Sequence, residues 1–476
     1  MLFSSTSFLF AFLPIFLGLY FLLPGTRLRN MLLLLGSLFF YAWGEAFYVL
    51  VLLASIVLNY AFGLLIEARK DRRAAFGILS AAVSMNLLLL GVFKYADFGV
   101  ENLNLILSQL GLGPIMLPSI HLPIGISFFS FQAITYVVDI YRRQAQAQKN
   151  PLRVGLYISL FPQLIAGPIV RYRQIADQLR TRQSRLKDIA EGMRRFVVGL
   201  AKKVLIANTL GQAADSIFSI PAAELQPAVA WLGILSFTFQ IYFDFAGYSD
   251  MAIGLGRCFG FSFPENFNWP YRSHSMREFW RRWHISLSTF FRDYLYIPLG
   301  GNRRGHVRTS LNLILVFLLC GLWHGASWNF VIWGMIHGLF LALERSSFGS
   351  LLSAWPRTIQ SLYVLIVVLL SWVFFRADDL THAWAYLNSL LGLNGASGND
   401  YPLSLYLNPR LILILCLASL SLSSWPRSLW LRFSNPAKGR ELPFESLRLA
   451  ALFLIFLLSA MSLAMGTHNP FIYFRF

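Results

Sequence analysis

Residues 309–345 read TSLNLILVFLLCGLWHGASWNFVIWGMIHGLFLALER. From 309 to 343 this stretch contains no Asp, Glu, Lys or Arg, but it contains His324 and His337. A helix needs roughly 20 largely apolar residues to cross a bilayer, so the stretch is long enough for two short crossings. It therefore predicts membrane-spanning helices with a histidine inside the membrane.

Similar apolar runs recur along the chain, which has 476 residues, 56% of them hydrophobic and 13% charged. This is the composition of a membrane protein and excludes a soluble domain. We predict an all-α polytopic membrane protein with about eleven or twelve transmembrane helices. The other runs lie near residues 4–24, 31–43, 46–66, 75–93, 122–141, 228–247, 358–375, 409–425 and 447–465.

One run, residues 154–170, is interrupted by Phe161-Pro162-Gln163 and by Gly167-Pro168, and basic residues flank it on both sides. Two basic flanks indicate that the segment enters and leaves the membrane on the same side. Non-helical backbone at that depth is tolerated only where protein or a water-filled cavity satisfies it. We predict a re-entrant segment that lines a cavity.

The formal net charge is +18, but the basic residues lie between the apolar runs instead of forming one block. This pattern follows the positive-inside rule and gives no reason to expect a nucleic acid partner. The first apolar run lacks a basic region before it, which predicts an uncleaved first helix and no cleaved signal peptide. Cys258, Cys320 and Cys416 are isolated, so we predict neither a disulfide nor a metal site.

Residues 277–296 read REFWRRWHISLSTFFRDYLY, and their apolar residues share one helical stripe. We predict an amphipathic cytoplasmic helix at the membrane surface, and a second interfacial helix within residues 185–218. The basic residues Arg277, Arg281 and Arg292 lie mostly off the stripe. They either orient a loop under the positive-inside rule or bind a phosphorylated cytosolic donor, and charge alone leaves both interpretations open.

His324 is the strongest candidate for catalysis, because ionisable residues within a membrane usually face a bundle interior or an aqueous cavity. A desolvated imidazole is favoured in its neutral form, which can take the proton of a hydroxyl that attacks a thioester. Gly321, Gly325 and Ala326 are small and are expected to leave room for substrate. The alternative is a histidine that hydrogen-bonds two helices together, which is the role we expect for His337.

Two acids, Asp244 and Asp250, end the run 228–247 on the predicted cytoplasmic side. They could position the basic segment 277–296 by ion pairing. A proton-relay transporter would use such acids as well, so that interpretation also stays open.

Three motifs are specific: RRWHISLS at residues 281–288, YLYIPLGGN at 294–302 and GLWHG at 321–325. Together they resemble the membrane-bound O-acyltransferase family, in a branch similar to bacterial alginate O-acetylation. The resemblance predicts a single domain over residues 1–476, with its most specific core at 122–345. Supporting matches lie at residues 123–128, 164–168, 242–250, 265–268 and 469–474.

The resemblance implies a ring of tilted helices around a thin central region. It makes His324 essential and places a second polar residue, here His284, near the donor. Together with the basic segment 277–296, this predicts a site with His324 and His284 as catalytic residues, Arg277, Arg281, Arg282, Trp283 and Asn302 for donor binding, and Trp323, Gln163, Asp244, Asp250, Asp293 and Tyr296 as tunnel or supporting residues.

The resemblance also implies that acetyl from cytoplasmic acetyl-CoA crosses the inner membrane to a periplasmic SGNH-type partner, which O-acetylates an exopolysaccharide such as alginate. Polysaccharide biosynthesis and export machinery and membrane lipid would be further partners. No permanently bound cofactor is expected. Gln163 stands where many relatives in the alginate branch have His, which leaves the polymer open.

The alternative function is a transporter of an acyl donor or polysaccharide without bond chemistry. A membrane glycosyltransferase would need carboxylates near the external face, where the sequence offers only Asp378, Asp379 and Asp400. It is the least favoured of the three.

Overall fold

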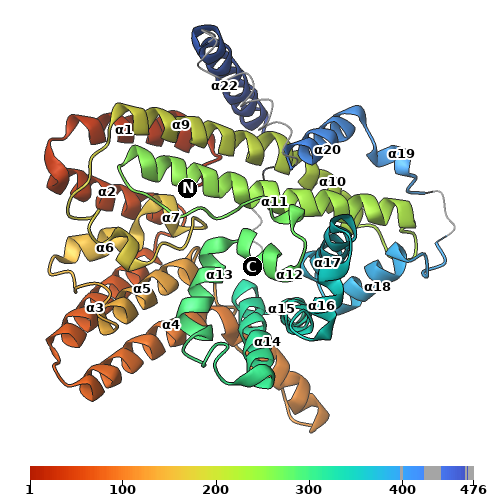
Figure 1. Ribbon diagram of the computed structural model, residues 1–476, viewed down its shortest axis with the longest axis horizontal. Coiled ribbons are helices and arrows are strands. Elements are labelled where there is room, and N and C mark those ends of the chain that lie inside the picture. The colour runs from red at the N-terminus through yellow and green to blue at the C-terminus, as the bar shows by residue number, and fades with distance from the viewer. Residues whose placement is uncertain (397–399, 423–440, 467–468, 470–476) are drawn as a thin grey trace. The chain divides into compact units, whose positions relative to one another are not determined.

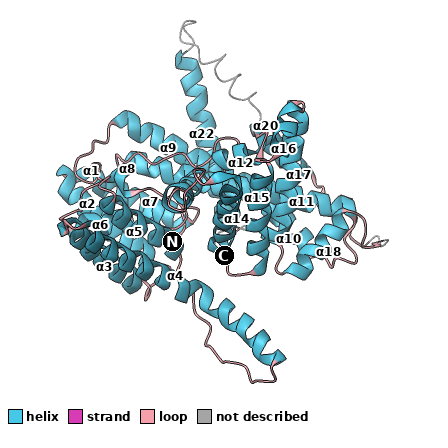
Figure 2. Ribbon diagram, turned by 60° about the horizontal axis from the view of Figure 1, so that its bottom comes forward, coloured by secondary structure: helices cyan, strands magenta, loops and turns pink. Residues whose placement is uncertain are grey.

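The computed structural model describes residues 1–396, 400–422, 441–466 and 469 (Figure 1). Within these ranges the chain consists of helices and loops, without strands (Figure 2). The predicted all-α architecture is therefore confirmed. The end of the predicted run 409–425, and residues 470–474 of the last family motif, lie outside the described residues.

Six described helices are long and apolar enough to cross a membrane, and four shorter helices are apolar. The chain is thus a multi-pass membrane protein, as predicted. The number of about eleven or twelve crossings stays a prediction. The long helices are Val49–Ala68, Arg72–Gln109, Pro227–Cys258, Gly305–His324, Arg357–Arg376 and Glu445–Ala464, and the shorter ones are Phe8–Leu22, Ile126–Tyr141, Trp328–Leu343 and Pro409–Ser421.

The chain divides into two compact units. Unit 1 comprises Met1–Met193 and Ala252–Pro264, and unit 2 comprises Arg194–Met251 and Glu265–Phe476. Two helices, α9 (Leu186–Ala201) and α11 (Pro227–Cys258), contribute residues to both units. The single domain predicted for residues 1–476 stays a prediction.

The core of unit 1 is a nearly fully buried helix, α5, which packs against α3, α4 and α6. Gly63 of α3 lies against the Tyr136 ring of α5, where a Cβ atom would lie 2.5 Å from a ring carbon, so a small residue is needed for this close packing. The helices of unit 1 are η1 (Phe8–Phe12), α1 (Leu13–Leu22), α2 (Gly25–Ala42), α3 (Val49–Ala68), α4 (Arg72–Gln109), α5 (Ile126–Tyr141), α6 (Pro151–Ser159), α7 (Phe161–Leu164) and α8 (Tyr172–Ile175).

The run 154–170 is interrupted, as predicted, by a break between α6 and α7. The Phe161 backbone N–H donates to Ser37 Oγ at 3.0 Å, which satisfies a group that the break leaves without a helical partner. Every residue from 154 to 170 is buried. Gln163 lies in unit 1, where its Nε2 donates to the Tyr157 carbonyl at 2.7 Å. The re-entrant path and a tunnel role for Gln163 stay predictions.

Unit 2 contains the predicted hairpin within residues 309–345 as two helices, α14 and α15. The segment 185–218 is helical, as α9, η2 and α10, and its interfacial position stays a prediction. The helices of unit 2, besides parts of α9 and α11, are η2 (Lys202–Ala207), α10 (Asn208–Phe218), η3 (Pro270–Arg272), α12 (Met276–Arg282), α13 (Ile285–Phe291), η4 (Arg292–Tyr296), α14 (Gly305–His324), α15 (Trp328–Leu343), α16 (Ser347–Ala354), α17 (Arg357–Arg376), α18 (Leu380–Leu390), α19 (Leu403–Tyr406), α20 (Pro409–Ser421) and α22 (Glu441–Ala464).

Helices α14 and α15 lie side by side with their backbones in contact (Figure 1). A Cβ atom on Gly321 would lie 2.1 Å from the Phe330 carbonyl oxygen, and one on Gly325 would lie 2.1 Å from the Phe330 ring. Gly334 approaches the Phe317 carbonyl in the same way. The expectation that Gly321 and Gly325 leave room for substrate is therefore wrong, because Phe330 fills the space that these glycines create.

The periodicity of segment 277–296 predicts one continuous helix, and this prediction is wrong. The segment consists of α12, α13 and η4, and the break between α12 and α13 lies at Trp283 and His284. His284 has φ 42° and ψ 55°, in the left-handed region that a residue with a side chain rarely adopts. Helical periodicity continues across the break, so it gives no sign of the turn.

Gly321→Ala should lower the free energy of unfolding by about 1–3 kcal/mol, because the new methyl group meets backbone that cannot move without separating α14 from α15. Gly77→Ala is the matched control, since a Cβ atom at Gly77 of α4 has no neighbour within 4 Å. Thermal unfolding of both purified variants in detergent would measure the difference. Equal stability would contradict the glycine-mediated packing.

Candidate active site

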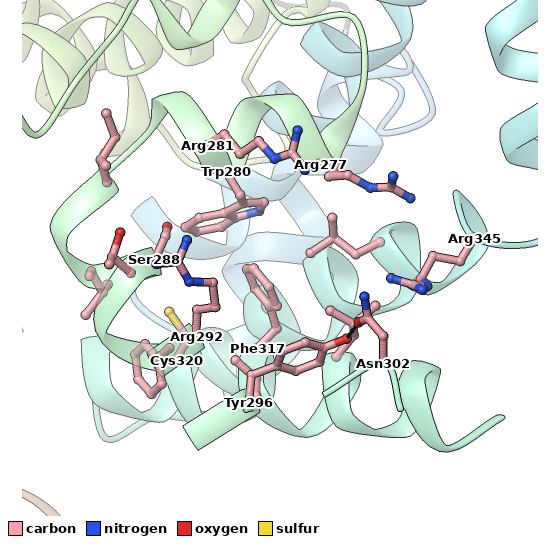
Figure 3. A pocket seen from close by; sticks show the side chains of 17 residues that line it. Arg277, Trp280, Arg281, Ser288, Arg292, Tyr296, Asn302, Phe317, Cys320 and Arg345 are labelled. Carbon is pink, nitrogen blue, oxygen red and sulfur yellow. Dashed lines mark hydrogen bonds between the residues drawn. The ribbon is translucent and has the colours of Figure 1, made fainter. Parts of the chain in front are cut away.

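Unit 2 contains a cavity of about 420 Å³ between α12, α13, η4, α14 and α15. Four arginines line it, and none of its 17 lining residues is an Asp or Glu. Figure 3 shows Arg277 and Arg281 on one side of the cavity, opposite Tyr296 and Asn302. Guanidinium groups bind phosphate through forked, charge-assisted hydrogen bonds, so the cavity suits a phosphate-bearing ligand. The four arginines are Arg277, Arg281, Arg292 and Arg345.

The rest of the wall is mainly apolar, with Trp280, Val316 and Phe317 among its residues. Ile285, which follows His284, and Cys320, one helical turn before His324, also line the cavity. A ligand with a phosphate at one end and a less polar portion at the other would match both parts of this wall.

The position of α12, which carries two of the arginines, depends on capping. Ser275 is its N-cap and accepts a hydrogen bond from the Glu278 backbone N–H at 3.0 Å. The Glu344 carboxylate, at the end of α15, accepts from the backbone N–H groups of Met276 at 2.5 Å and Arg277 at 3.0 Å. A carboxylate also stabilises a helix N-terminus electrostatically. Glu344 thus holds α12 against the end of α15.

Three of the five predicted donor-binding residues, Arg277, Arg281 and Asn302, line the cavity, together with the supporting residue Tyr296. Arg282 does not. Its guanidinium group is paired with Glu278 at 2.6 Å.

Trp283 is also absent from the cavity lining, because it packs against Phe279 and Trp372.

Arg345 lines the cavity but is not among the predicted site residues. The sequence cannot show that the end of α15 meets the N-terminus of α12. Arg292, for which the sequence leaves loop orientation and donor binding open, also lines the cavity.

His284 is the N-cap residue of α13 and is fully buried. Its Nδ1 lies 3.1 Å from Asn266 Oδ1, which also accepts hydrogen bonds from the Ser286 backbone N–H and Oγ. A backbone N–H can only donate, so Asn266 Oδ1 is an acceptor and His284 Nδ1 must carry the proton.

The second nitrogen, His284 Nε2, is therefore a bare acceptor, and it has no hydrogen-bond partner among the described residues. His284 lies outside the candidate membrane spans. Burial lowers its pKa to about 3, so the imidazole is neutral at physiological pH.

His324 is the last residue of α14 and is buried in an aromatic environment. Its ring centroid lies 4.9 Å from Trp323, 5.0 Å from Trp333 and 5.3 Å from Phe375. The His284 ring lies 6.1 Å from Trp323. The Trp323 indole is thus a common neighbour of the two histidines predicted to be catalytic.

His337 has the bonding of a structural histidine. The Trp280 indole N–H donates to His337 Nδ1 at 3.3 Å, and His337 Nε2 lies 3.1 Å from Ser371 Oγ. Ser371 Oγ donates to the Val368 carbonyl at 2.8 Å, so it can accept from Nε2. Both nitrogens have partners, as expected for a histidine that links helices.

The predicted ion pairs of Asp244 and Asp250 exist, but their partners differ from the expected ones. Asp244 Oδ1 lies 2.9 Å from Lys203 Nζ, and Asp250 Oδ2 lies 2.6 Å from Lys202 Nζ. The lysines belong to η2, so the two acids do not pair with the arginines of residues 277–296. Within those residues, Asp293 pairs with its neighbour Arg292 at 2.8 Å.

Asp250 is nevertheless connected to the segment that orients His284. Arg195 lies 2.8 Å from Asp250 and 2.5 Å from Glu265. Glu265 immediately precedes Asn266, the residue that binds His284 Nδ1. Asn266 belongs to a motif that the sequence singles out, but its contact with His284 depends on the turn between α12 and α13.

No group of three or more His, Cys, Asp or Glu side chains in the described part of the chain could hold a metal ion.

Residues 115–381 match the family described as MBOAT, membrane-bound O-acyltransferase. The chain is 50% identical over 388 residues to the probable alginate O-acetylase of Azotobacter vinelandii, which covers 81% of this chain and 77% of that protein. It is 42% identical over 493 residues to the probable alginate O-acetylase of Pseudomonas putida, with 100% of each chain covered. It is 40% identical over 434 residues to the peptidoglycan O-acetyltransferase of Helicobacter pylori, with 83% and 81% covered.

The hydrogen bonds predict opposite tautomers for two buried histidines. ¹⁵N spectra of selectively labelled protein should show His284 protonated on Nδ1 and neutral from about pH 5 to about pH 8, and His337 with its proton on Nε2. Asn266→Ala should remove the preference at His284, while Trp280→Phe should affect His337. A proton on Nε2 of His284 in the wild-type protein would contradict the assignment.

Proposed function

Because the chain belongs to the membrane-bound O-acyltransferase family and is an acyltransferase, we propose that it passes acetyl from cytoplasmic acetyl-CoA across the inner membrane for the O-acetylation of an extracytoplasmic polysaccharide. The family and the enzyme class predicted from the sequence are confirmed. Several relatives are named as O-acetylases or O-acetyltransferases of bacterial polymers, which supports acetyl as the transferred group.

The cavity lined by four arginines is the observation that carries the donor assignment. Acetyl-CoA has phosphates at one end and a thioester at the other, joined by a long, weakly polar arm. The arginines would hold the phosphates, and the apolar wall would take the arm. Neither His284 nor His324 lines this cavity. Ile285 follows His284 in the chain and Cys320 lies one helical turn before His324, so we place the thioester at the end of the cavity that these two residues line.

The proposed chemistry is acyl transfer with His324 as general base. Its imidazole takes the proton of the acceptor hydroxyl while the hydroxyl oxygen attacks the thioester carbonyl carbon. The C–S bond then breaks, and the proton passes to the departing sulfur, which leaves as the CoA thiol. His284 Nε2, a bare acceptor, would accept a hydrogen bond from a substrate N–H or O–H and orient it.

The depth of His324 suits transfer across the membrane. Helix α14 runs from Gly305 to His324, and at 1.5 Å per residue its 20 residues extend about 30 Å. The acetyl group would therefore leave the enzyme on the face opposite to the donor. In the inner membrane this face is the periplasm, where an SGNH-type partner and the polysaccharide machinery would receive it. The relatives act on alginate or peptidoglycan by name, so the polymer itself stays open.

A transporter without bond chemistry was the alternative. It would need intramembrane acids that can exchange protons, but Asp244 and Asp250 are held in ion pairs with Lys203 and Lys202. Together with the enzyme class of the family, this favours acyl transfer.

His324→Ala should reduce acetyl transfer by about 100-fold or more, because the general base is lost. Acetyl ester on the secreted polymer of cells that carry the variant would measure it. His337→Ala is a poor control, because it would break two structural hydrogen bonds and lower stability by itself. The control is therefore a comparison of the membrane level and thermal stability of His324→Ala with those of wild type. Normal acetylation by a folded variant would rule out the assignment.

Arg281→Gln should weaken CoA binding by about ten-fold, since one charge-assisted hydrogen bond to phosphate is lost. Arg282→Gln is the matched control, because Arg282 is adjacent in sequence and carries the same charge but is paired with Glu278 outside the cavity. Affinity can be measured by calorimetry on purified protein. Equal losses of CoA affinity in both variants would mean that these arginines only orient the loop relative to the membrane.

A further inference from the structure

Unit 1 contains a hollow of about 630 Å³. It is separate from the cavity lined by four arginines in unit 2, called the donor cavity below, and none of the predicted site residues lines it. It lies where α3 ends, α4 begins and α5 ends. Five of its lining residues are cationic, and Glu67 is the one carboxylate among those that the structure describes there. The cations are Arg69, Lys70, Arg72, Arg142 and Arg143.

Glu67 does not balance this charge. One of its oxygens accepts a hydrogen bond from the Ala147 backbone N–H at 2.7 Å, and Ala147 is not among the residues that line the hollow. One carboxylate facing five cations leaves the hollow strongly positive. An anion is therefore the ligand that it would attract.

The beginning of α4 adds to this positive field. Arg72 and Arg73 occupy its first turn, where the helix dipole already presents positive charge, and no acidic residue lies in that turn. The N-cap residue Asp71 offsets part of this field by accepting from the Arg73 and Ala74 backbone N–H groups. Arg72 is held over the Tyr141 ring of α5 at 5.8 Å, which keeps its charge at the hollow.

The end of α5 gives a second, independent indication. Arg143 has φ 58°, and the bonds from Arg143 N to Ile140 O and from Gln144 N to Asp139 O form a Schellman motif around it. Glycine is the usual residue at this position because a side chain is strained there. The chain nevertheless places a guanidinium group at that point, on the wall of the hollow.

The surroundings favour a lipid over a soluble anion. Helices α3 and α4 are both candidate membrane spans, and basic residues at their ends mark the cytoplasmic face. Leu65 of α3 and Phe76 of α4, each within about one helical turn of the cationic residues, are 47% and 57% exposed. An acyl chain could lie against these apolar side chains while its headgroup enters the hollow.

We propose that this hollow binds the phosphate headgroup of an anionic phospholipid from the cytoplasmic leaflet. The guanidinium and ammonium groups would bind the phosphate oxygens, and Leu65 and Phe76 would contact the acyl chains. The site is independent of acyl transfer, so it can be tested without an activity measurement.

The test uses the full chain purified in detergent, with phosphatidylglycerol added and phosphatidylcholine as the zwitterionic comparison. Arg143→Gly removes a cation and the backbone strain together, so without lipid the variant should be at least as stable as wild type. Its affinity for phosphatidylglycerol, measured by native mass spectrometry, should fall by about five-fold. Removing Arg69 as well, as Arg69→Gln/Arg143→Gly, should lower the affinity by about five-fold again.

The control is Arg180→Gln/Arg185→Gln, which removes the same charge from exposed positions of unit 1 outside the hollow. It should bind phosphatidylglycerol as wild type does. Equal losses in the two double variants would overturn the proposal. So would tight binding of sn-glycerol 3-phosphate alone, with no preference for phosphatidylglycerol over phosphatidylcholine, because the hollow would then be a site for a soluble anion.

Discussion

The hydrogen bonds that converge on the Asn266 side chain hold together the parts of unit 2 on which the candidate site depends. Oδ1 accepts from His284 and from Ser286, at the beginning of α13, while Nδ2 donates to Ser249 of α11 at 3.0 Å. All of these groups are buried, and a buried polar group without a partner costs roughly 1–3 kcal/mol. One amide therefore fixes a strained turn, the tautomer of a histidine and the position of α13 against α11.

Three buried histidines among the described residues of unit 2 show why burial alone does not identify a catalytic residue. His337 is as buried as His284, but Trp280 and Ser371 occupy both of its nitrogens. His284 has one nitrogen bonded, and the other has no hydrogen-bond partner among the described residues. His324, at the end of α14, depends for its assignment on its aromatic surroundings and on the family to which the chain belongs. A histidine in a charge-free run is thus a weak signal until its hydrogen bonds are known.

Much of the fold could be predicted from the sequence, because apolar runs of the right length have few alternatives to membrane helices. The predictions failed where the outcome depends on contacts between segments. The break at His284 lies in a segment with continuous helical periodicity, and its left-handed turn depends on Asn266, 18 residues earlier in the chain. Gly321 and Gly325 were interpreted as open space, since sequence shows that a residue is small but not which side chain packs on it.

The charge in the donor cavity depends partly on where the Glu344 carboxylate is directed. Glu344 precedes Arg345 in the chain, and without other partners it could neutralise the arginines. Its oxygens instead receive hydrogen bonds from the Met276 and Arg277 backbone N–H groups and from the Tyr363 hydroxyl at 3.3 Å. The carboxylate therefore compensates the N-terminus of α12 and keeps that helix, with its two arginines, at the wall. Arg292 is paired with Asp293 at 2.8 Å, so Arg277, Arg281 and Arg345 are the arginines that this arrangement leaves for the phosphates of a ligand.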